Sequence, residues 1–333
     1  ALQVFTGSTG IFSLDGQQVL TTCADSSLRI WKTADGTLTA SMKGHTGRIL
    51  CAAFSKDGQR VISGSDDQTA RVWNPASGRE ELRLSIHAGR VVSVAFSPDA
   101  SMALTAGADS IVRIWDARSG ALLTSLTGHR GYVYTAVFSN DGRRVLTAGL
   151  DRTARIWDAG SGKALYTLQG HNRPVIAAAF SSDDQWVLTA SWDQTIRIWE
   201  TESGRQLQVL NSHTHDVRAA AFGPDKSWIL SAGEDNRTIL WDAARGSMLY
   251  TRLQLDAHDW LVHDTAFHFD GSAAAIEKLY FACGLEIVEL GQLKDSLWIP
   301  GLSSLKIQRK PLQIDDRPAP GIRALDLCGI TPL

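Results

Sequence analysis

Histidine, a hydroxyl residue and aspartate recur together along this chain, and hydrolases combine these three side-chain types in a nucleophilic triad. One set consists of His129, Thr147 and Asp151, and sets with the same spacing start at His45 and His171. A catalytic triad is needed once in a chain, whereas these sets return at a constant interval. The recurrence favours a structural role, so the elements that carry the sets must be considered before any chemistry is assigned.

The tryptophans show that the interval is an internal repeat. Six of the 11 tryptophans follow one another at steps of 42 residues: Trp31, Trp73, Trp115, Trp157, Trp199 and Trp241. Phenylalanine lies 19 residues before each of them, aspartate 16 and six residues before, and glycine five residues after. Serine or threonine lies ten residues before each, and histidine lies 28 residues before the last five. Self-similarity at such a period is typical of solenoids and propellers.

Each repeat also has the pattern of short strands and tight turns. In the unit around Trp157, residues 145–146 are apolar and residues 154–157 alternate with period two. Glycines 142 and 162 supply the positive φ that hairpin turns need. Residues 164–168 form a further strand. The pattern predicts four short strands in each unit, joined into one antiparallel sheet.

Three motifs carry a resemblance to a known family: glycine–histidine, then Phe-Ser-x-Asp-Gly, then a strand of the type Arg-Ile-Trp-Asp. Residues 44–74, 128–158 and 170–200 contain the combination almost whole. From residue 1 to about residue 290, the chain resembles the WD-repeat family of β-propellers. The resemblance implies an all-β fold in which blades of four antiparallel strands pack around a channel. Six regular units and a degenerate seventh predict a seven-bladed β-propeller.

The resemblance also implies a buried chain of hydrogen bonds through histidine, hydroxyl, aspartate and tryptophan in each unit. Such a chain satisfies polar groups whose burial would otherwise be costly, and it ties the loop before the first strand to the turn between the second and third. The expected members are His45, Ser63, Asp67, Trp73, His129, Thr147, Asp151, Trp157, His171, Thr189, Asp193 and Trp199.

The seventh unit is degenerate. His258, Phe267 and the turn residues Asp270 and Gly271 remain, but the tryptophan is lost, and its position falls near Glu286. Residues 285–290 still alternate like a strand. We therefore assign residues 1–290 to the propeller.

Residues 291–333 form a separate C-terminal segment that contains five of the nine prolines. Residues 304–309 alternate like a strand. We expect part of 291–309 to supply the outer strand of the last blade, closing the ring and removing its edge. An eighth blade built from the segment is the alternative.

Composition excludes several classes of function. The formal net charge is −2 over 333 residues, so we expect neither nucleic-acid nor membrane binding, and no apolar run is long enough to span a bilayer. The four cysteines form no Cys-x-x-Cys pair, which favours a cytoplasmic location without a zinc site. Histidine clusters at 213–215 and 258–268 occupy repeat or strand positions, so we expect neither a metal nor another cofactor.

Partners of this family often bind the face where the loop after each histidine meets the residue before each turn aspartate. The resemblance therefore implies that the partner-binding residues of this chain are Arg48, Asp66, Arg90, Tyr132, Tyr134, Leu150, Trp192, Arg218 and Glu234. The framework of the repeats is nearly constant while these positions differ. A binding surface on a uniform scaffold has this property.

Trp192 is the most informative of these residues. It lies outside the 42-residue spacing, and tryptophan, tyrosine and arginine dominate binding hot spots. The expected patch consists of Tyr132, Tyr134, Leu150 and Trp192, flanked by Arg90 and Arg218. In the alternative interpretation, Trp192 only packs over a neighbouring turn.

The expected function is a non-catalytic scaffold or adaptor that binds a protein or peptide on this face, as a monomer or within a larger complex. The competing hypothesis is a hydrolase-like enzyme with a site at the channel mouth or in the seventh unit. An enzyme should place a unique polar constellation in one unit, and the sequence contains no clear one.

Overall fold

The computed structural model describes residues 9–85, 87–256, 258–266, 268–278, 280–283, 286–289, 297–300 and 302. Over these residues the chain consists of 28 strands and one short helix, which confirms the expected all-β class. None of the helical structure in the described ranges is long and apolar enough to cross a membrane.

Five sheets contain four antiparallel strands each, paired in chain order. Their strands are β1 (Thr9–Phe12), β2 (Gln18–Thr22), β3 (Ser27–Lys32), β4 (Leu38–Lys43), β5 (Ile49–Phe54), β6 (Val61–Ser65), β7 (Ala70–Trp73), β8 (Glu80–Leu84), β9 (Val91–Phe96), β10 (Met102–Gly107), β11 (Val112–Asp116), β12 (Leu122–Leu126), β13 (Val133–Phe138), β14 (Arg144–Gly149), β15 (Ala154–Asp158), β16 (Ala164–Leu168), β17 (Val175–Phe180), β18 (Trp186–Ser191), β19 (Ile196–Glu200) and β20 (Gln206–Leu210).

A sixth sheet has six strands and a further sheet has two. Their elements are β21 (Val217–Phe222), β22 (Trp228–Gly233), β23 (Arg237–Asp242), β24 (Met248–Gln254), β25 (Trp260–His263), β26 (Phe269–Gly271), α1 (Ala273–Lys278), β27 (Tyr280–Cys283) and β28 (Glu286–Glu289).

The β13–β16 sheet shows how the sequence produces this arrangement. Val145 of β14 lies opposite Phe138 of β13 on one side and opposite Trp157 of β15 on the other. Gly142 (φ 72°) and Gly162 (φ 70°) occupy the turns before and after these central strands. Glycine adopts such φ values more readily than other residues, so the two glycines favour chain reversals at these positions.

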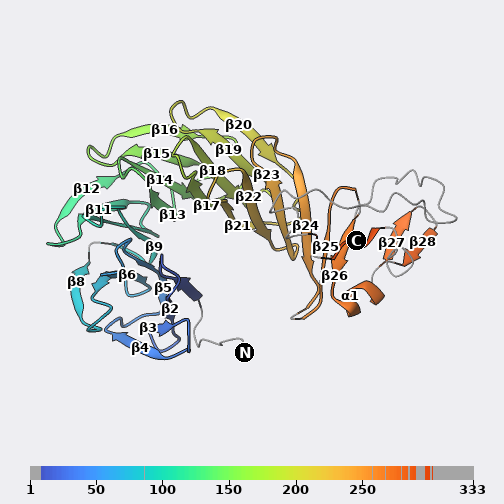
Figure 1. Ribbon diagram of the computed structural model, residues 1–333. Coiled ribbons are helices and arrows are strands. Elements are labelled where there is room, and N and C mark those ends of the chain that lie inside the picture. Colours follow the sequence, from blue (N-terminus) through green and yellow to red (C-terminus); the bar gives the residue numbers. More distant parts are fainter. Residues whose placement is uncertain are drawn as a thin grey trace.

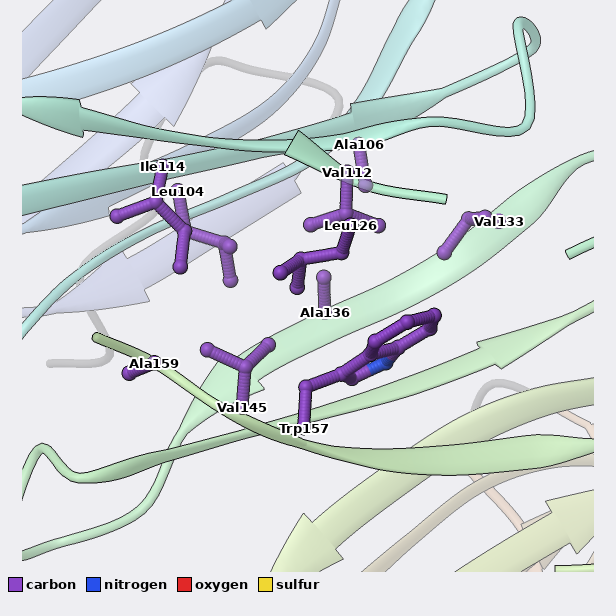
Figure 2. Packing of buried hydrophobic residues seen from close by; sticks show 10 residues of the cluster. All are labelled: Leu104, Ala106, Val112, Ile114, Leu126, Val133, Ala136, Val145, Trp157 and Ala159. Carbon is purple, nitrogen blue, oxygen red and sulfur yellow. The ribbon is translucent and has the colours of Figure 1, made fainter. Parts of the chain in front are cut away.

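The core of the molecule lies between successive sheets. Figure 2 shows Trp157 and Val145 facing Leu126 and Val112 of the preceding sheet, and all four belong to one cluster of buried residues. The second strand is almost wholly buried, whereas the fourth is largely exposed, as β14 and β16 illustrate. A sheet that lies between two others is therefore covered on both faces near its inner strands, and in the four-stranded sheets the fourth strand forms the outer edge.

Figure 1 shows the six sheets from β1 to β26 arranged side by side along an arc. The described residues form six sheets of the repeated kind instead of the expected seven, and they do not close the arc into a ring. At one end of the arc, Phe12 of the first sheet is 66% exposed. At the other end, Leu230 of the sixth sheet is 37% exposed, whereas the equivalent Leu104 and Leu146 are fully buried.

The first half of the seventh unit does not begin a new blade, and that expectation was wrong. β25 pairs with β24, and β26 pairs with β25, so both strands extend the sixth sheet. Asp270 and Gly271, expected in a turn, lie in β26, and His258 is exposed instead of buried. Phe267 lies outside the described residues.

Two local features explain this departure. β24 has seven residues, against five or six in the other fourth strands, and it offers a long free edge for pairing. The seventh unit also lacks the tryptophan that packs the second to sixth sheets onto the preceding sheet. Edge pairing therefore takes the place of face packing.

The C-terminal segment is described only at residues 297–300 and 302. Leu297 and Trp298 pack against Phe269, while Leu302 packs against Leu240. The N–H of Ile299 also donates to the Phe269 carbonyl over 2.8 Å. Glu286 lies in β28, as the alternation of residues 285–290 predicted. The remainder of the expected closing strand within 291–309, and the alternative eighth blade, lie outside the described residues.

Candidate functional site

Each of the last five regular units contains one chain of buried hydrogen bonds, which the fourth sheet illustrates. Nε1 of Trp157 donates to Oγ1 of Thr147 over 2.8 Å. Oγ1 lies 2.7 Å from Nε2 of His129, and Nδ1 of His129 lies 3.0 Å from an oxygen of Asp151. An ionised carboxylate only accepts, so Nδ1 carries the histidine proton. Thr147 then donates to Nε2 and accepts from the indole, and every polar group in the chain has a partner.

The same chain occurs in the second and fifth units. Ser63 lies 2.8 Å from Nε2 of His45 and accepts from Trp73 over 2.8 Å. The corresponding distances at Thr189 are 2.9 Å to His171 and 2.8 Å to Trp199. The aspartate oxygens lie 2.8 Å from the histidine Nδ1 in both units, in the pairs Asp67 with His45 and Asp193 with His171.

Electrostatics favour the neutral form of two network histidines and the ionised form of the network aspartates. Burial lowers the pKa of His45 and of His213. Burial alone would raise the pKa of Asp67, but hydrogen bonds from Thr69 and His45 hold that pKa well below its usual range. The pKa of Asp151 is held low in the same way, by His129 and the backbone N–H of Arg130.

This geometry does not suit a hydrolase. Ser63 and Thr147, the hydroxyls that would act as nucleophiles, are fully buried and bonded to an indole. Each chain instead links the second and third strands of its sheet to a loop at the sheet edge. The arrangement stabilises the position of that loop.

The positions carried over as partner-binding residues lie at this edge. The loop before the first strand and the turn after the second are joined by one recurring backbone bond. Leu150 N–H donates to the Tyr132 carbonyl over 2.8 Å, and Trp192 N–H donates to the Pro174 carbonyl over 3.1 Å. Equivalent bonds join Asp66 to Arg48 and Glu234 to Asp216. We call this surface of loops and turns the loop face.

An aromatic run crosses the loop face from the fourth sheet to the sixth. Tyr132 and Tyr134 stack with ring centroids 5.9 Å apart. Tyr134 contacts Trp192 of the next unit at 5.7 Å, and the Arg218 guanidinium lies 5.4 Å from the Trp192 ring centroid. Leu150 is 40% exposed beside Tyr132. Three neighbouring sheets therefore contribute to one surface.

Charged groups hold the far end of the aromatic run. Nε of Arg218 donates to Oε1 of Glu234 over 2.9 Å. Arg173 donates to the Trp192 carbonyl and pairs with Asp216, both over 3.2 Å. Trp192 is thus half-buried among side chains of two units, and its Nε1 atom is covered without a hydrogen-bond partner.

Three of the carried-over residues lie apart from the aromatic run. Arg90 pairs with Asp66 of the preceding unit over 3.3 Å, and Arg48 is exposed. Arg90 was expected to flank the aromatic patch, but the ion pair that the structure shows joins it to the second sheet.

Comparison with known proteins agrees with this architecture. A family model described as WD domain, G-beta repeat matches residues 1–32, 36–74, 78–116, 120–158, 162–200 and 204–242. The chain belongs to the WD40 repeat family. WD40 repeats generally mediate protein–protein interactions and are typically non-enzymatic. The comparison with curated proteins gave no match.

The opposite edge of the WD40 sheets carries a cavity of about 480 Å³. Its lining consists of Asp141, Arg144, Asp183, Asp184, Gln185, Trp186, Glu200 and Glu202. Two of these carboxylates already have partners within the protein. Glu202 pairs with Arg144 over 2.7 Å, and Asp184 accepts a hydrogen bond from Asn140 over 2.8 Å. Over the described part of the chain, no group of three or more His, Cys, Asp or Glu side chains is placed to hold a metal ion.

Sequence reasoning missed Arg173. It lies one residue before Pro174, a position outside those that the family pattern selects, yet it binds the backbone of Trp192. Its adjacency to a loop proline was the only available signal. The pairing of Arg173 with Asp216 depends on two units coming together in space.

Proposed function

We propose that this WD40 protein is a non-catalytic scaffold or adaptor that binds a protein or peptide on its loop face. The observation that supports this most directly is the contact series from Tyr132 and Tyr134 through Trp192 to Arg218. Tyrosine, tryptophan and arginine are the residues most enriched in binding hot spots. Their apolar bodies supply contact area and their polar tips supply direction.

The framework beneath this face favours binding by a preorganised surface. A histidine–aspartate pair joins each loop that contains an expected partner-binding residue to the core, as at His129 and Asp151. A surface that is ordered before binding loses little conformational entropy when the partner arrives. The proposed role therefore requires no rearrangement of the scaffold.

The proposal also covers the location of the protein, its assembly and the classes of ligand that it does not bind. We infer a cytoplasmic protein that acts as a monomer or within a larger complex and binds neither nucleic acid nor membranes. The near-neutral charge of −2 and the sparse cysteines support this inference.

We also propose that the arc closes into a seven-bladed ring whose seventh blade is built from residues after β26, with the help of 291–333. The exposed Phe12 and Leu230 lie on the two sheets that end the arc, at positions that neighbouring sheets cover elsewhere. One more blade between these two sheets would cover both residues.

The test compares partner capture by the wild-type protein, Trp192→Ala and the control Trp186→Ala. Trp186 lies at the opposite edge and also has a cation over its ring, Lys226 at 4.7 Å. Proteins recovered from native extract are quantified by mass spectrometry, after circular dichroism shows that all three proteins are folded. We expect Trp192→Ala alone to lose a specific partner by about 30-fold or more, the loss typical of a hot-spot tryptophan. Equal recovery by all three proteins would contradict the proposal.

A further inference from the structure

The exposed layer of the loop face carries more positive than negative side chains. Its arginines are Arg48, Arg90, Arg130, Arg152, Arg173 and Arg218. Outside the buried networks its acidic residues are Asp25, Asp66, Asp216 and Glu234. These four carboxylates already pair with Arg29, Arg90, Arg173 and Arg218. Within the described ranges, no acidic side chain pairs with Arg48, Arg130 or Arg152.

Two of these arginines border the apolar part of the face. Arg130 precedes Tyr132 in the loop, and Arg152 follows Leu150 in the turn. The loop and the turn are joined, because Leu150 N–H donates to the Tyr132 carbonyl over 2.8 Å and Arg130 N–H donates to Asp151 over 3.0 Å. Both arginine side chains are exposed. Both arginines therefore start from backbone positions next to Asp151, close in the chain to Tyr132 and Leu150.

We propose that the segment that docks on this face is an acidic peptide. Its carboxylates pair with Arg130 and Arg152, and between them an apolar or aromatic side chain packs on Tyr132, Tyr134 and Leu150. The planar guanidinium group matches a carboxylate with two parallel hydrogen bonds. This inference rests on the proposed function of the same face and specifies the partner's chemistry.

A peptide fits these charges better than a nucleic acid does. Nucleic-acid surfaces carry a continuous basic stripe that follows the phosphates. Here the carboxylates of Asp66, Asp216 and Glu234 interrupt the arginines, and the overall charge is −2. Arginine side chains that are separated in this way suit the separate carboxylates of an acidic peptide better than a continuous row of phosphates.

The test begins with a random peptide library displayed on phage and selected on the immobilised wild-type protein. The recovered peptides are synthesised with a fluorescent label and measured by anisotropy on wild type, Trp192→Ala and the double variant Arg130→Gln with Arg152→Gln. The matched control is Arg79→Gln with Arg118→Gln, because both arginines are exposed in turns between third and fourth strands, at the opposite edge. A labelled single-stranded oligonucleotide is measured in parallel.

We expect selected sequences enriched in aspartate and glutamate around one apolar residue. Exposed ion pairs are individually modest, so the Arg130 and Arg152 double variant should bind them roughly three- to tenfold more weakly. The control variant should bind like wild type, and added salt should reduce the difference.

Other outcomes overturn the inference in distinguishable ways. Neutral or basic peptides that still require Trp192 would refute the acidic partner and leave the proposed function standing. Peptides that bind Trp192→Ala as well as wild type, or no selected peptides at all, would argue against the proposed function itself. Arginine-dependent binding of the oligonucleotide, tighter than that of any peptide, would replace the peptide by a nucleic acid.

Discussion

Nε1 of Trp157 donates a hydrogen bond to Oγ1 of Thr147 over 2.8 Å, and this bond joins β15 to β14 at the centre of the fourth sheet. Trp73 and Ser63 form the same bond at the same distance two units earlier. From the hydroxyl the chain continues through His129 to Asp151 at the sheet edge. The loop face is therefore anchored by buried residues that lie beneath it.

Replacement of Thr147 by valine should destabilise the fold without affecting partner binding by the folded protein. Valine preserves the shape but leaves the Trp157 indole N–H and Nε2 of His129 without their partner. Each unsatisfied buried group costs about 1–3 kcal/mol, so the free energy of unfolding should fall by about 2–6 kcal/mol. Urea denaturation measures this change. The control is Thr127→Val in an exposed loop, and an equal effect of both substitutions would contradict the network.

His129→Ala tests the other half of the same chain. It removes the group that links Thr147 to Asp151, so the melting temperature should fall clearly. His215, which is exposed, provides the matched substitution and should leave the melting temperature close to that of wild type. A wild-type melting temperature in His129→Ala would show that the bonds contribute nothing.

Mild acid should weaken the fold through His45 and His213. Burial lowers the pKa of both histidines, so below the unfolded value of about 6.5 the unfolded chain binds more protons than the folded chain. Their contribution is fully present above that pH and is lost as the pH falls through the folded values. Urea unfolding at several pH values should show this loss, with a shallower slope in His45→Gln with His213→Gln. An unchanged slope would assign the acid sensitivity to other groups.

The aspartates of the networks act in the same direction at lower pH. The pKa values of Asp67 and Asp193 are held below the usual range, so their contribution is present above about pH 3.9 and is lost as the pH falls further.

Removal of Trp192 or Arg218 should change stability little. Arg218 is exposed, and cation–π contacts at exposed sites contribute about 0.5–1 kcal/mol. Thermal unfolding of Trp192→Ala and Arg218→Ala should therefore lie close to wild type. A loss as large as that expected of Thr147→Val would instead identify Trp192 as a cover for the neighbouring turn.

Deletion of residues 291–333 should yield unstable or aggregating protein. The described part of this segment covers apolar groups, because Leu297 and Trp298 pack on Phe269 and Leu302 packs on Leu240. Truncation after residue 302 is the matched control, since it keeps these contacts. Melting temperature and light scattering measure the outcome, and a stable, monodisperse 1–290 fragment would argue against the role assigned to the segment.

Much of this architecture could be predicted from local pattern. The tryptophan spacing predicts the sheets, because one unit of 42 residues returns six times with its turn glycines and apolar strands in phase. The family match over six repeats confirms the resemblance. The loop-face positions follow from the same phase, since equal spacing within equal sheets brings equivalent residues to one edge.

The sequence alone determined the repeating sheet, its register and the residues that the spacing places at each sheet edge. Their causes are local: turn glycines, alternating strands and a tryptophan at a constant position. Only the tertiary structure decided that β25 and β26 extend the sixth sheet, that Arg90 pairs with Asp66, and that Arg173 binds the backbone of Trp192. Those outcomes depend on which edges and charges from different units meet in space, and no periodicity within one unit encodes such a meeting.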